Sequence, residues 1–149
     1  MSTASSGDDA GGVASFEPLG RSECLDLLAT AAVGRVAFVV EGHPELLPVN
    51  YALDGDTVLF RTAVGTVLNR AAMTPVAFEV DHVDESTRTG WSVLVKGQAD
   101  DIGDAIDATS ERMRRLSLVT WAPGRRDRWF AIRPRQITGR RLRVVPLEQ

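Results

Sequence analysis

Three apolar segments that follow one another at hairpin spacing constrain the fold of this chain most strongly. They span residues 33–40, 46–53 and 57–62 and are rich in valine, leucine and other apolar residues. The first two are separated by Glu41-Gly42-His43-Pro44, and the second and third by Asp54-Gly55-Asp56. Because both linkers contain turn-forming residues, the three segments are predicted to form an antiparallel meander.

Further strand patterns follow along the chain. Residues 76–81 and 90–99 alternate apolar with polar positions, at least in part, and two more strands fit residues 128–133 and 136–145, the last interrupted near Gly139. Such alternation with period two is typical of strands with one buried face.

Helices are expected only between the strands. Ser22 is a plausible N-cap of a short first helix, residues 66–72 fit one or two helical turns, and residues 104–116 fit a helix with aspartates in its first turn and arginines in its last. Closely spaced antiparallel strands with helices at the corners predict a mainly β fold with peripheral helices, a β-barrel rather than a doubly wound sheet.

Composition sets the outer bounds. The chain has 149 residues, of which 44% are hydrophobic and 25% charged, as in globular proteins. Residues 1–15 are expected to be a disordered tail and residues 16–149 one folded domain. The tail lacks the pattern of a signal peptide and no apolar run would span a bilayer, so a cytoplasmic protein is expected. Cys24 is the only cysteine, which excludes an internal disulfide.

The net charge of −3 hides an asymmetry. Residues 1–111 hold 6 basic and 18 acidic side chains, whereas residues 112–149 hold 11 arginines against Asp127 and Glu148. This basic segment either balances an acidic face within the fold or a dimer, or binds a phosphate or another anionic ligand. Nucleic-acid binding is the third alternative. The acidic remainder of the chain makes it less favourable, because negative charge repels a polyanion.

The segment Phe60–Thr66 has the chemistry of a phosphate anchor. An apolar strand ends there in a glycine-containing turn, and a helix is predicted to begin. Arg61 offers a bidentate guanidinium, Thr62 and Thr66 offer hydroxyl groups, and Gly65 lies in the turn before the free N–H groups of the helix N-terminus. An exposed strand-end arginine beside an ordinary helix cap is the alternative.

Motifs of several other enzyme classes are absent from the sequence. It contains no glycine fingerprint for dinucleotides, no Walker loop, no Gly-x-Ser-x-Gly elbow and no His-Glu-x-x-His pair. The two histidines, His43 and His82, are interpreted as exposed polar residues. No catalytic side chain and no metal site is predicted.

Several short motifs occur together in a characteristic order and spacing. They are Pro48-Val49-Asn50-Tyr51, Asp54-Gly55-Asp56, Phe60-Arg61-Thr62 with Gly65-Thr66, Pro75–Asp81, Gly90–Gly97 and Ile137-Thr138-Gly139-Arg140. In these motifs the chain resembles the pyridoxamine 5'-phosphate oxidase-like family of flavin-binding split barrels, and within it the short actinobacterial and nitroimidazole-resistance-like branch. The resemblance covers residues 17–145.

The resemblance implies a six-stranded antiparallel split β-barrel that forms a homodimer, with flavin mononucleotide (FMN) in each of two clefts between the subunits. Trp91 and Ser92 would approach the flavin from the neighbouring strand or from the partner subunit. A place in the barrel or dimer core is the alternative for both Trp91 and Trp121. The residues that the resemblance assigns to the cofactor are Arg61, Thr62, Gly65 and Thr66 for the phosphate, Pro48, Val49 and Asn50 for the isoalloxazine ring, and Trp91, Ser92 and Trp121 for the surrounding walls.

One departure from the family pattern concerns the phosphate. The family usually has a lysine or arginine after the Gly-Thr pair, whereas this chain has Val67. Losing such a charge-assisted hydrogen bond costs roughly 1.5 to 3 kcal/mol. FMN is therefore expected to bind weakly, unless an arginine of the basic C-terminal segment supplies the missing charge.

The resemblance implies an FMN-dependent oxidoreductase that transfers hydride between the flavin and a reduced nicotinamide or a small organic substrate. A deazaflavin-dependent reductase and a non-catalytic flavin- or deazaflavin-binding protein are the alternatives. Arg125, Arg126 and Arg128 would form a cationic groove for the acidic tail of a deazaflavin. The expected partners are a second copy of the chain and small molecules, and neither nucleic acid nor a membrane.

Overall fold

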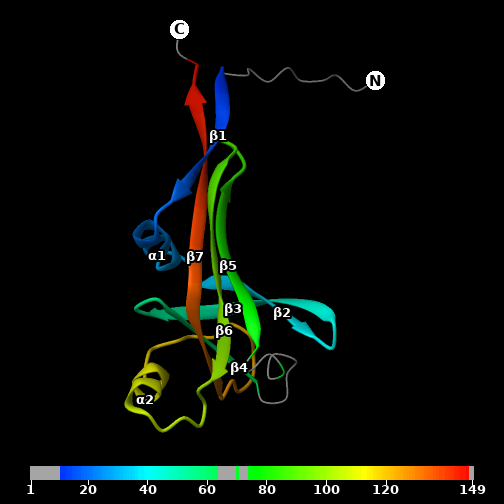
Figure 1. Cartoon of the computed structure of the whole chain (residues 1–149), viewed down its shortest axis with the longest axis vertical. Coiled ribbons are helices and arrows are strands. Elements are labelled where there is room, and N and C mark those ends of the chain that lie inside the picture. Colours follow the sequence, from blue (N-terminus) through cyan, green and yellow to red (C-terminus); the bar gives the residue numbers. More distant parts are fainter. Residues whose placement is uncertain (1–10, 64–69, 71–73, 148–149) are drawn as a thin grey trace.

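A computed structural model describes residues 11–63, 70 and 74–147 of the chain, which form strands and two short helices (Figure 1). The predicted strands at residues 33–40, 46–53, 57–62, 76–81 and 90–99 are confirmed, most with slightly wider bounds. The elements are β1 (Gly12–Leu19), α1 (Arg21–Leu28), β2 (Val33–Val40), β3 (His43–Asp54), β4 (Thr57–Thr62), β5 (Pro75–Asp84), β6 (Thr89–Asp101), α2 (Ala108–Arg114) and β7 (Arg128–Pro146).

The described strands form one antiparallel sheet in the order β1-β7-β4-β3-β2-β5-β6, and β6 also pairs with β7. This second pairing closes β7, β4, β3, β2, β5 and β6 into a ring. The expected six-stranded barrel is this ring, and β1 is an additional seventh strand that pairs with the C-terminal half of β7 from Gly139 to Pro146.

Strand β7 corrects the prediction of two separate strands at residues 128–133 and 136–145. It is one continuous strand along the long axis of the molecule (Figure 1). Pro134 lies where the β6–β7 register shifts, so that Lys96 faces Gln136 while Gly97 faces Pro134. A bulge of this kind accommodates a proline because the ladder is already interrupted there.

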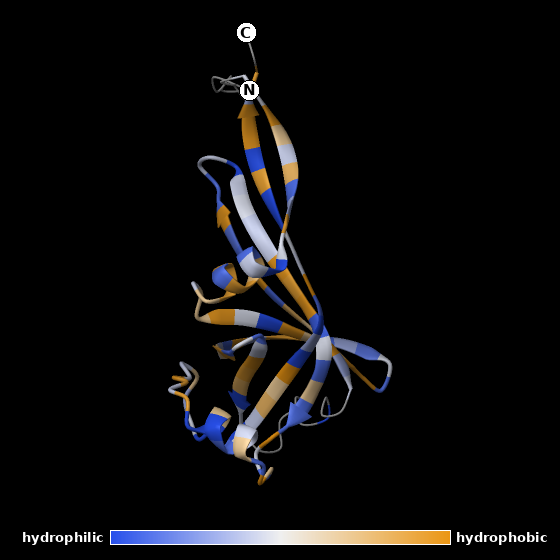
Figure 2. Ribbon diagram, turned by 60° about the vertical axis from the view of Figure 1, so that its left-hand side comes forward, coloured by the Kyte–Doolittle hydropathy of each residue, from blue (hydrophilic) through white to orange (hydrophobic). Residues whose placement is uncertain are grey.

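The barrel interior is filled from every strand of the ring. Apolar and polar residues alternate along the strands (Figure 2), and the inward positions include Val36, Phe78, Val93 and Phe130, all fully buried. A Cβ atom on Gly34 would overlap the Phe78 ring, so a residue without a side chain is required at this point of β2.

A second, smaller apolar cluster lies under α2. Leu59, Met113, Leu118 and Trp129 are buried there on the opposite face of β4 from the barrel interior. Strand β4 is therefore covered on both faces. Because side chains two residues apart share a face of a strand, Arg61 follows Leu59 toward the α2 side.

Three predicted boundaries differ from the structure. Strand β1 includes residues 12–15, which were expected in the disordered tail, because their backbone pairs with β7 although their small side chains give little strand signal. Helix α1 is preceded by Gly20 as N-cap, so the prediction of Ser22 is wrong. Helix α2 is shorter than expected and begins after Asp107, whose carboxylate accepts a 2.8 Å hydrogen bond from the backbone N–H of Ser110. The helical turns predicted at residues 66–72 fall almost entirely outside the described residues.

The basic C-terminal segment is paired with acidic residues from the rest of the chain. Arg112 contacts Asp54 at 2.6 Å, Arg133 contacts Asp100 at 2.5 Å, and a third pair joins β7 to β1. These pairs support the interpretation that this segment balances an acidic face within the fold. In the described part of the chain, no helix has the length and apolar character to cross a membrane.

Candidate functional site

Arg61 lies at the end of β4, where the loop between α2 and β7 covers the strand. Its Nε donates a 2.9 Å hydrogen bond to the carbonyl of Arg126, and its Nη1 donates one of 3.4 Å to the carbonyl of Leu118. The guanidinium also lies 5.0 Å from the ring centroid of Trp129, within cation–π distance. These contacts hold the guanidinium in one place, and among the described residues Nη2 has no hydrogen-bond partner.

Asn50 fixes the same loop from β3. Its Nδ2 donates to the carbonyl of Ala32 at 3.2 Å, and its Oδ1 accepts a 2.8 Å hydrogen bond from the backbone N–H of Trp121. The side chain of Trp121 itself is largely exposed, since the residue keeps 70% of its accessible surface. The loop is thus anchored at one point by Asn50 and at others by Arg61.

These contacts enclose a small cavity of about 100 Å³ between β3, β4 and the loop. Among the described residues that line it, the polar ones are two arginines, one asparagine and one threonine, and none carries a carboxylate. This donor set fits an anion such as phosphate. Ligand sites for whole cofactors usually measure about 300 to 1,000 Å³, so this cavity fits one end of such a molecule. The lining residues are Pro48, Val49, Asn50, Arg61, Thr120, Ala122 and Arg126.

Four predicted site residues, Pro48, Val49, Asn50 and Arg61, therefore meet in one cavity. Trp121 does not line it, and its backbone N–H binds Asn50, which does. Thr62 does not belong to the lining, because it points to the opposite face of β4. It is 1% exposed, and its hydroxyl donates to the carbonyl of Ala63 at 3.1 Å. Gly65 and Thr66, together with Val67, lie outside the described residues.

Trp91 and Ser92 are not part of this cavity. They lie on β6, where Ser92 faces Asp81 on β5 and Arg140 on β7. Both line a hollow of about 510 Å³ near the tip of the β5–β6 hairpin. In the register of the sheet, Ser92 and Pro48 both lie on the outward side of the barrel, with β2 and β5 between their strands. The row of paired residues that starts at Pro48 runs through Arg35 and Glu79 to Leu94, two residues from Ser92. Three spacings of about 4.8 Å, roughly 14 Å along the sheet, therefore separate the two strands.

Glu79 lies between these two groups on the outward side of β5. Burial and the neighbouring carboxylate of Asp81 raise the pKa of Glu79 to about 7, although Arg35 opposes this shift. Arg35 Nη1 is 3.7 Å from Glu79 and 3.6 Å from Asp81. The Oε1 atom of Glu79 is buried and has no hydrogen-bond partner in the part of the chain that the structure describes. Glu79 and Ser92 also line a hollow of about 570 Å³.

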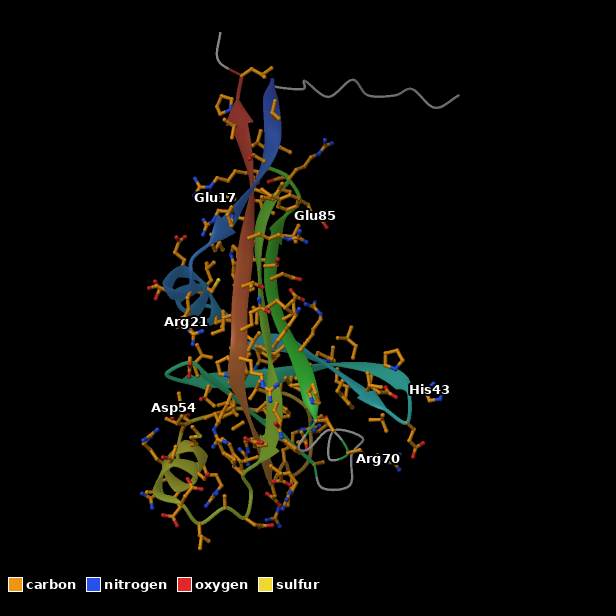
Figure 3. The ribbon with its side chains drawn as sticks, in the orientation of Figure 1. Glu17, Arg21, His43, Asp54, Arg70 and Glu85 are labelled. Atoms are coloured by element: carbon orange, nitrogen blue, oxygen red, sulfur yellow. The ribbon has the colours of Figure 1, made fainter. Side chains whose placement is uncertain are left out.

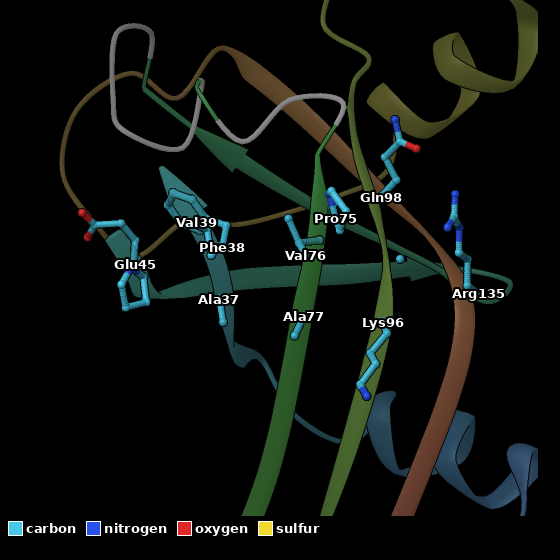
Figure 4. A pocket seen from close by; sticks show the side chains of 12 residues that line it. Ala37, Phe38, Val39, Glu45, Pro75, Val76, Ala77, Lys96, Gln98 and Arg135 are labelled. Atoms are coloured by element: carbon cyan, nitrogen blue, oxygen red, sulfur yellow. The ribbon is translucent and has the colours of Figure 1, made fainter. Parts of the chain in front are cut away.

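Another cavity, of about 450 Å³, lies at the other end of the outward side and is mostly apolar (Figure 4). Ala37 and Val39 line it from β2, and Ala77 lines it from β5. Lys96 and Arg135 belong to the strands at its far side (Figure 4).

The described residues offer little that would hold a metal. They contain no group of three or more His, Cys, Asp and Glu side chains placed to bind an ion. His43 lies at the exposed tip of the β2–β3 hairpin, away from the barrel (Figure 3), and His82 is also exposed.

Thr120 and Ala122 were not predicted as site residues from the sequence. Arg126 was predicted, but only together with Arg125 and Arg128, as part of a groove for the acidic tail of a deazaflavin. The structure separates them, and only Arg126 of the three lines the cavity. Pro123-Gly124, just before these arginines, indicates a turn in the sequence. A turn signal does not reveal which of the following side chains points into a cavity.

The chain is similar to known proteins over most of its length. A family model described as pyridoxamine 5'-phosphate oxidase matches residues 20–141. The uncharacterized protein Rv0080 of Mycobacterium tuberculosis is 35% identical over 130 residues, which cover 83% of this chain and 84% of that protein.

Solved structures share the fold. The FAD binding protein from Mycobacterium smegmatis matches with a TM-score of 0.70 and 37% identity, over 85% of this chain and 97% of that one. A conserved protein of unknown function from Corynebacterium diphtheriae matches with a TM-score of 0.68 and 32% identity, over 84% and 96% of the two chains. The resemblance seen in the sequence is confirmed, and the chain belongs to the pyridoxamine 5'-phosphate oxidase-like family of split barrels.

Proposed function

We propose that this chain is a flavin-dependent oxidoreductase that works as a cytoplasmic homodimer and binds FMN or FAD through the cavity beside Arg61. The observation that carries the proposal is the lining of that cavity, in which Arg61, Asn50 and Arg126 meet and none of the described residues is a carboxylate. The similarity to the FAD binding protein from Mycobacterium smegmatis supports a flavin nucleotide as the ligand. Both FMN and FAD carry a phosphate on the ribityl chain, so one anchor serves either.

The residues of the cavity divide the work of holding the cofactor. Arg61 would bind the phosphate through Nη2, because Nε and Nη1 already hold the loop. Pro48 and Val49 would supply an apolar wall next to the isoalloxazine ring. When bound, the flavin supplies the hydride chemistry, so the chain needs no nucleophile or metal of its own. Its task is to fix the phosphate and to orient the ring.

A second copy of the chain would complete the site. The cavity beside Arg61 is too small for a whole flavin. Ser92 lies elsewhere on the outward side of the barrel, whereas Trp91, on the opposite face of β6, packs against the barrel core. Val39 and Leu46 expose 59% and 62% of their surfaces on that same side. Burying such apolar side chains against a partner is favourable. In the proposed dimer, Ser92 of one subunit, with Trp91 next to it on β6, would approach the flavin held at Arg61 of the other.

Reconstitution of the purified protein tests this proposal. The protein is titrated separately with FMN, FAD and a deazaflavin, and bound cofactor is measured by absorbance and by the rise in melting temperature. Binding of FMN or FAD, followed by anaerobic bleaching with NADH or NADPH, is the expected result. If the protein binds only the deazaflavin tightly, its cofactor is a deazaflavin and not a flavin. If it binds flavin that no nicotinamide or chemical electron donor reduces, it is a non-catalytic binding protein. A chain that binds none of the three would refute the proposal.

A further inference from the structure

We infer that Arg126 is a second phosphate-binding residue of this site, brought to it by the loop between α2 and β7. The inference rests on the proposed flavin site, since Arg61 belongs to both. Arg126 would then contribute to the affinity for the flavin phosphate and not to the affinity for the isoalloxazine ring.

Three neighbouring arginines at the end of the loop between α2 and β7 differ in their ion pairs. Arg125 is largely exposed and contacts Asp127 at 3.2 Å. Arg128 pairs with two aspartates that precede α2. Arg126 forms no ion pair within the described part of the chain, and its Nε is buried without a hydrogen-bond partner. Of the three, Arg126 is the one whose charge has not been balanced.

The fold holds Arg126 next to another arginine. The carbonyl of Arg126 accepts the 2.9 Å hydrogen bond from Arg61 Nε. Earlier in the same loop, the backbone N–H of Trp121 is bound to Asn50. The backbone of Arg126 is therefore held beside the cavity by Arg61.

Two guanidinium groups on a cavity of about 100 Å³ repel one another when no acid lies among the lining residues. A bound anion offsets this repulsion, because it attracts both guanidinium groups. Arginine prefers phosphate and carboxylate groups, which it binds through two parallel N–H donors. Thr120 and Asn50 add a hydroxyl and an amide N–H, neutral donors from which phosphate oxygens can accept hydrogen bonds. The cavity is large enough for a phosphate group and too small for the ring system attached to it.

Comparison of FMN with riboflavin tests this inference, because riboflavin lacks only the phosphate. Dissociation constants for both ligands are measured by flavin fluorescence for the wild type, Arg126→Met and Arg125→Met. Arg125→Met is the matched control, because this variant removes the same charge from the same loop at a residue that does not line the cavity. We expect Arg126→Met to raise the dissociation constant of FMN about ten- to hundredfold and to change that of riboflavin by less than about twofold. Arg125→Met should change neither dissociation constant. Arg126→Lys, which keeps the charge and loses the planar donors, should fall between.

A structural role for Arg126 would weaken both ligands alike, and that result would overturn the inference. Melting temperatures of the unliganded variants identify any that fail to fold, and Arg126→Lys then replaces Arg126→Met in the comparison. If the wild type binds neither FMN nor riboflavin, the proposed function fails, and inorganic pyrophosphate is titrated by calorimetry instead. Pyrophosphate binding that Arg126→Met abolishes and Arg125→Met preserves would then support an anion site of another kind. Absence of pyrophosphate binding, or equal binding by both variants, would overturn it.

Discussion

The backbone N–H of Trp121 donates a 2.8 Å hydrogen bond to Oδ1 of Asn50, which ties the loop before β7 to strand β3. Asn50 uses its other amide atom to hold Ala32, so a single side chain joins three segments of the fold at the edge of the cavity. The loop and the barrel meet there as one site.

Replacing Asn50 should loosen this junction. Asn50→Ala removes two hydrogen bonds, each worth about 0.5 to 1.5 kcal/mol, and it frees the loop that carries Arg126. We expect flavin affinity to fall about five- to tenfold or more, measured by fluorescence titration. Asn50→Asp preserves the acceptor for Trp121 and adds a negative charge to the cavity, so it should weaken FMN more than riboflavin. Equal FMN affinity in the wild type and both variants would show that Asn50 has no part in the site.

A mixed dimer tests whether one site uses residues from two subunits. Arg61→Ala damages the phosphate side, and Ser92→Tyr should block the opposite side through its bulk. If each site combines Arg61 of one subunit with Ser92 of the other, a mixed dimer contains one site with both defects and one with none. Flavin binding should therefore reappear when the two inactive variants are unfolded, mixed and refolded together. No recovery, with dimers confirmed by light scattering, would contradict a shared site.

Glu79 should make stability depend on pH. The pKa of Glu79 is raised from 4.5 to about 7 by burial and by Asp81, so the folded protein retains a proton that the unfolded chain has already lost. The free energy of unfolding should therefore fall as the pH rises from about 4.5 to about 7. Glu79→Gln should flatten this fall, as measured by urea unfolding across the range. Glu85→Gln, at the exposed tip of the β5–β6 hairpin (Figure 3), serves as the control and should keep the wild-type profile. A Glu79→Gln profile as steep as that of the wild type would disprove this assignment.

Gly34 should tolerate no side chain. An added Cβ would overlap the fully buried ring of Phe78, which packs edge-on against Tyr51 with 4.9 Å between ring centroids. Gly34→Ala should lower the free energy of unfolding by about 1 to 3 kcal/mol, measured by denaturant titration. Gly20→Ala is the control, because a Cβ there meets no atom within 4 Å, and its cost should stay below about 1 kcal/mol. Equal stability of the two variants would show that the barrel adapts at Gly34.

The barrel could be predicted because its information is local. Turn residues such as Gly55 and the alternation around Phe78 define strands without reference to distant parts of the chain. Strand β1 could not be predicted in this way, since its order comes from pairing with residues 139–146 near the other end of the sequence. The continuity of β7 through Pro134 depends on a bulge opposite Lys96, which is likewise a property of two strands together.

The candidate site was predictable to a similar extent. Arg61 and Asn50 were identified from chemistry and family resemblance, and the structure brings them to one cavity. Arg126 could not be distinguished from Arg125 in the sequence, because the difference is whether a carboxylate lies nearby in space. Trp91 and Ser92 remain predictions, since their part in the site depends on a second subunit.

The affinity of the Arg61→Ala variant for FMN tests the central claim most directly. Loss of a guanidinium bound to phosphate costs roughly 1.5 to 3 kcal/mol, so the dissociation constant measured by fluorescence titration should rise more than tenfold. Arg21→Ala, which removes an exposed arginine paired with Asp56 at 2.6 Å, should bind FMN as the wild type does. Equal FMN affinity of the wild type, Arg61→Ala and Arg21→Ala would contradict the assignment of the flavin phosphate to this cavity.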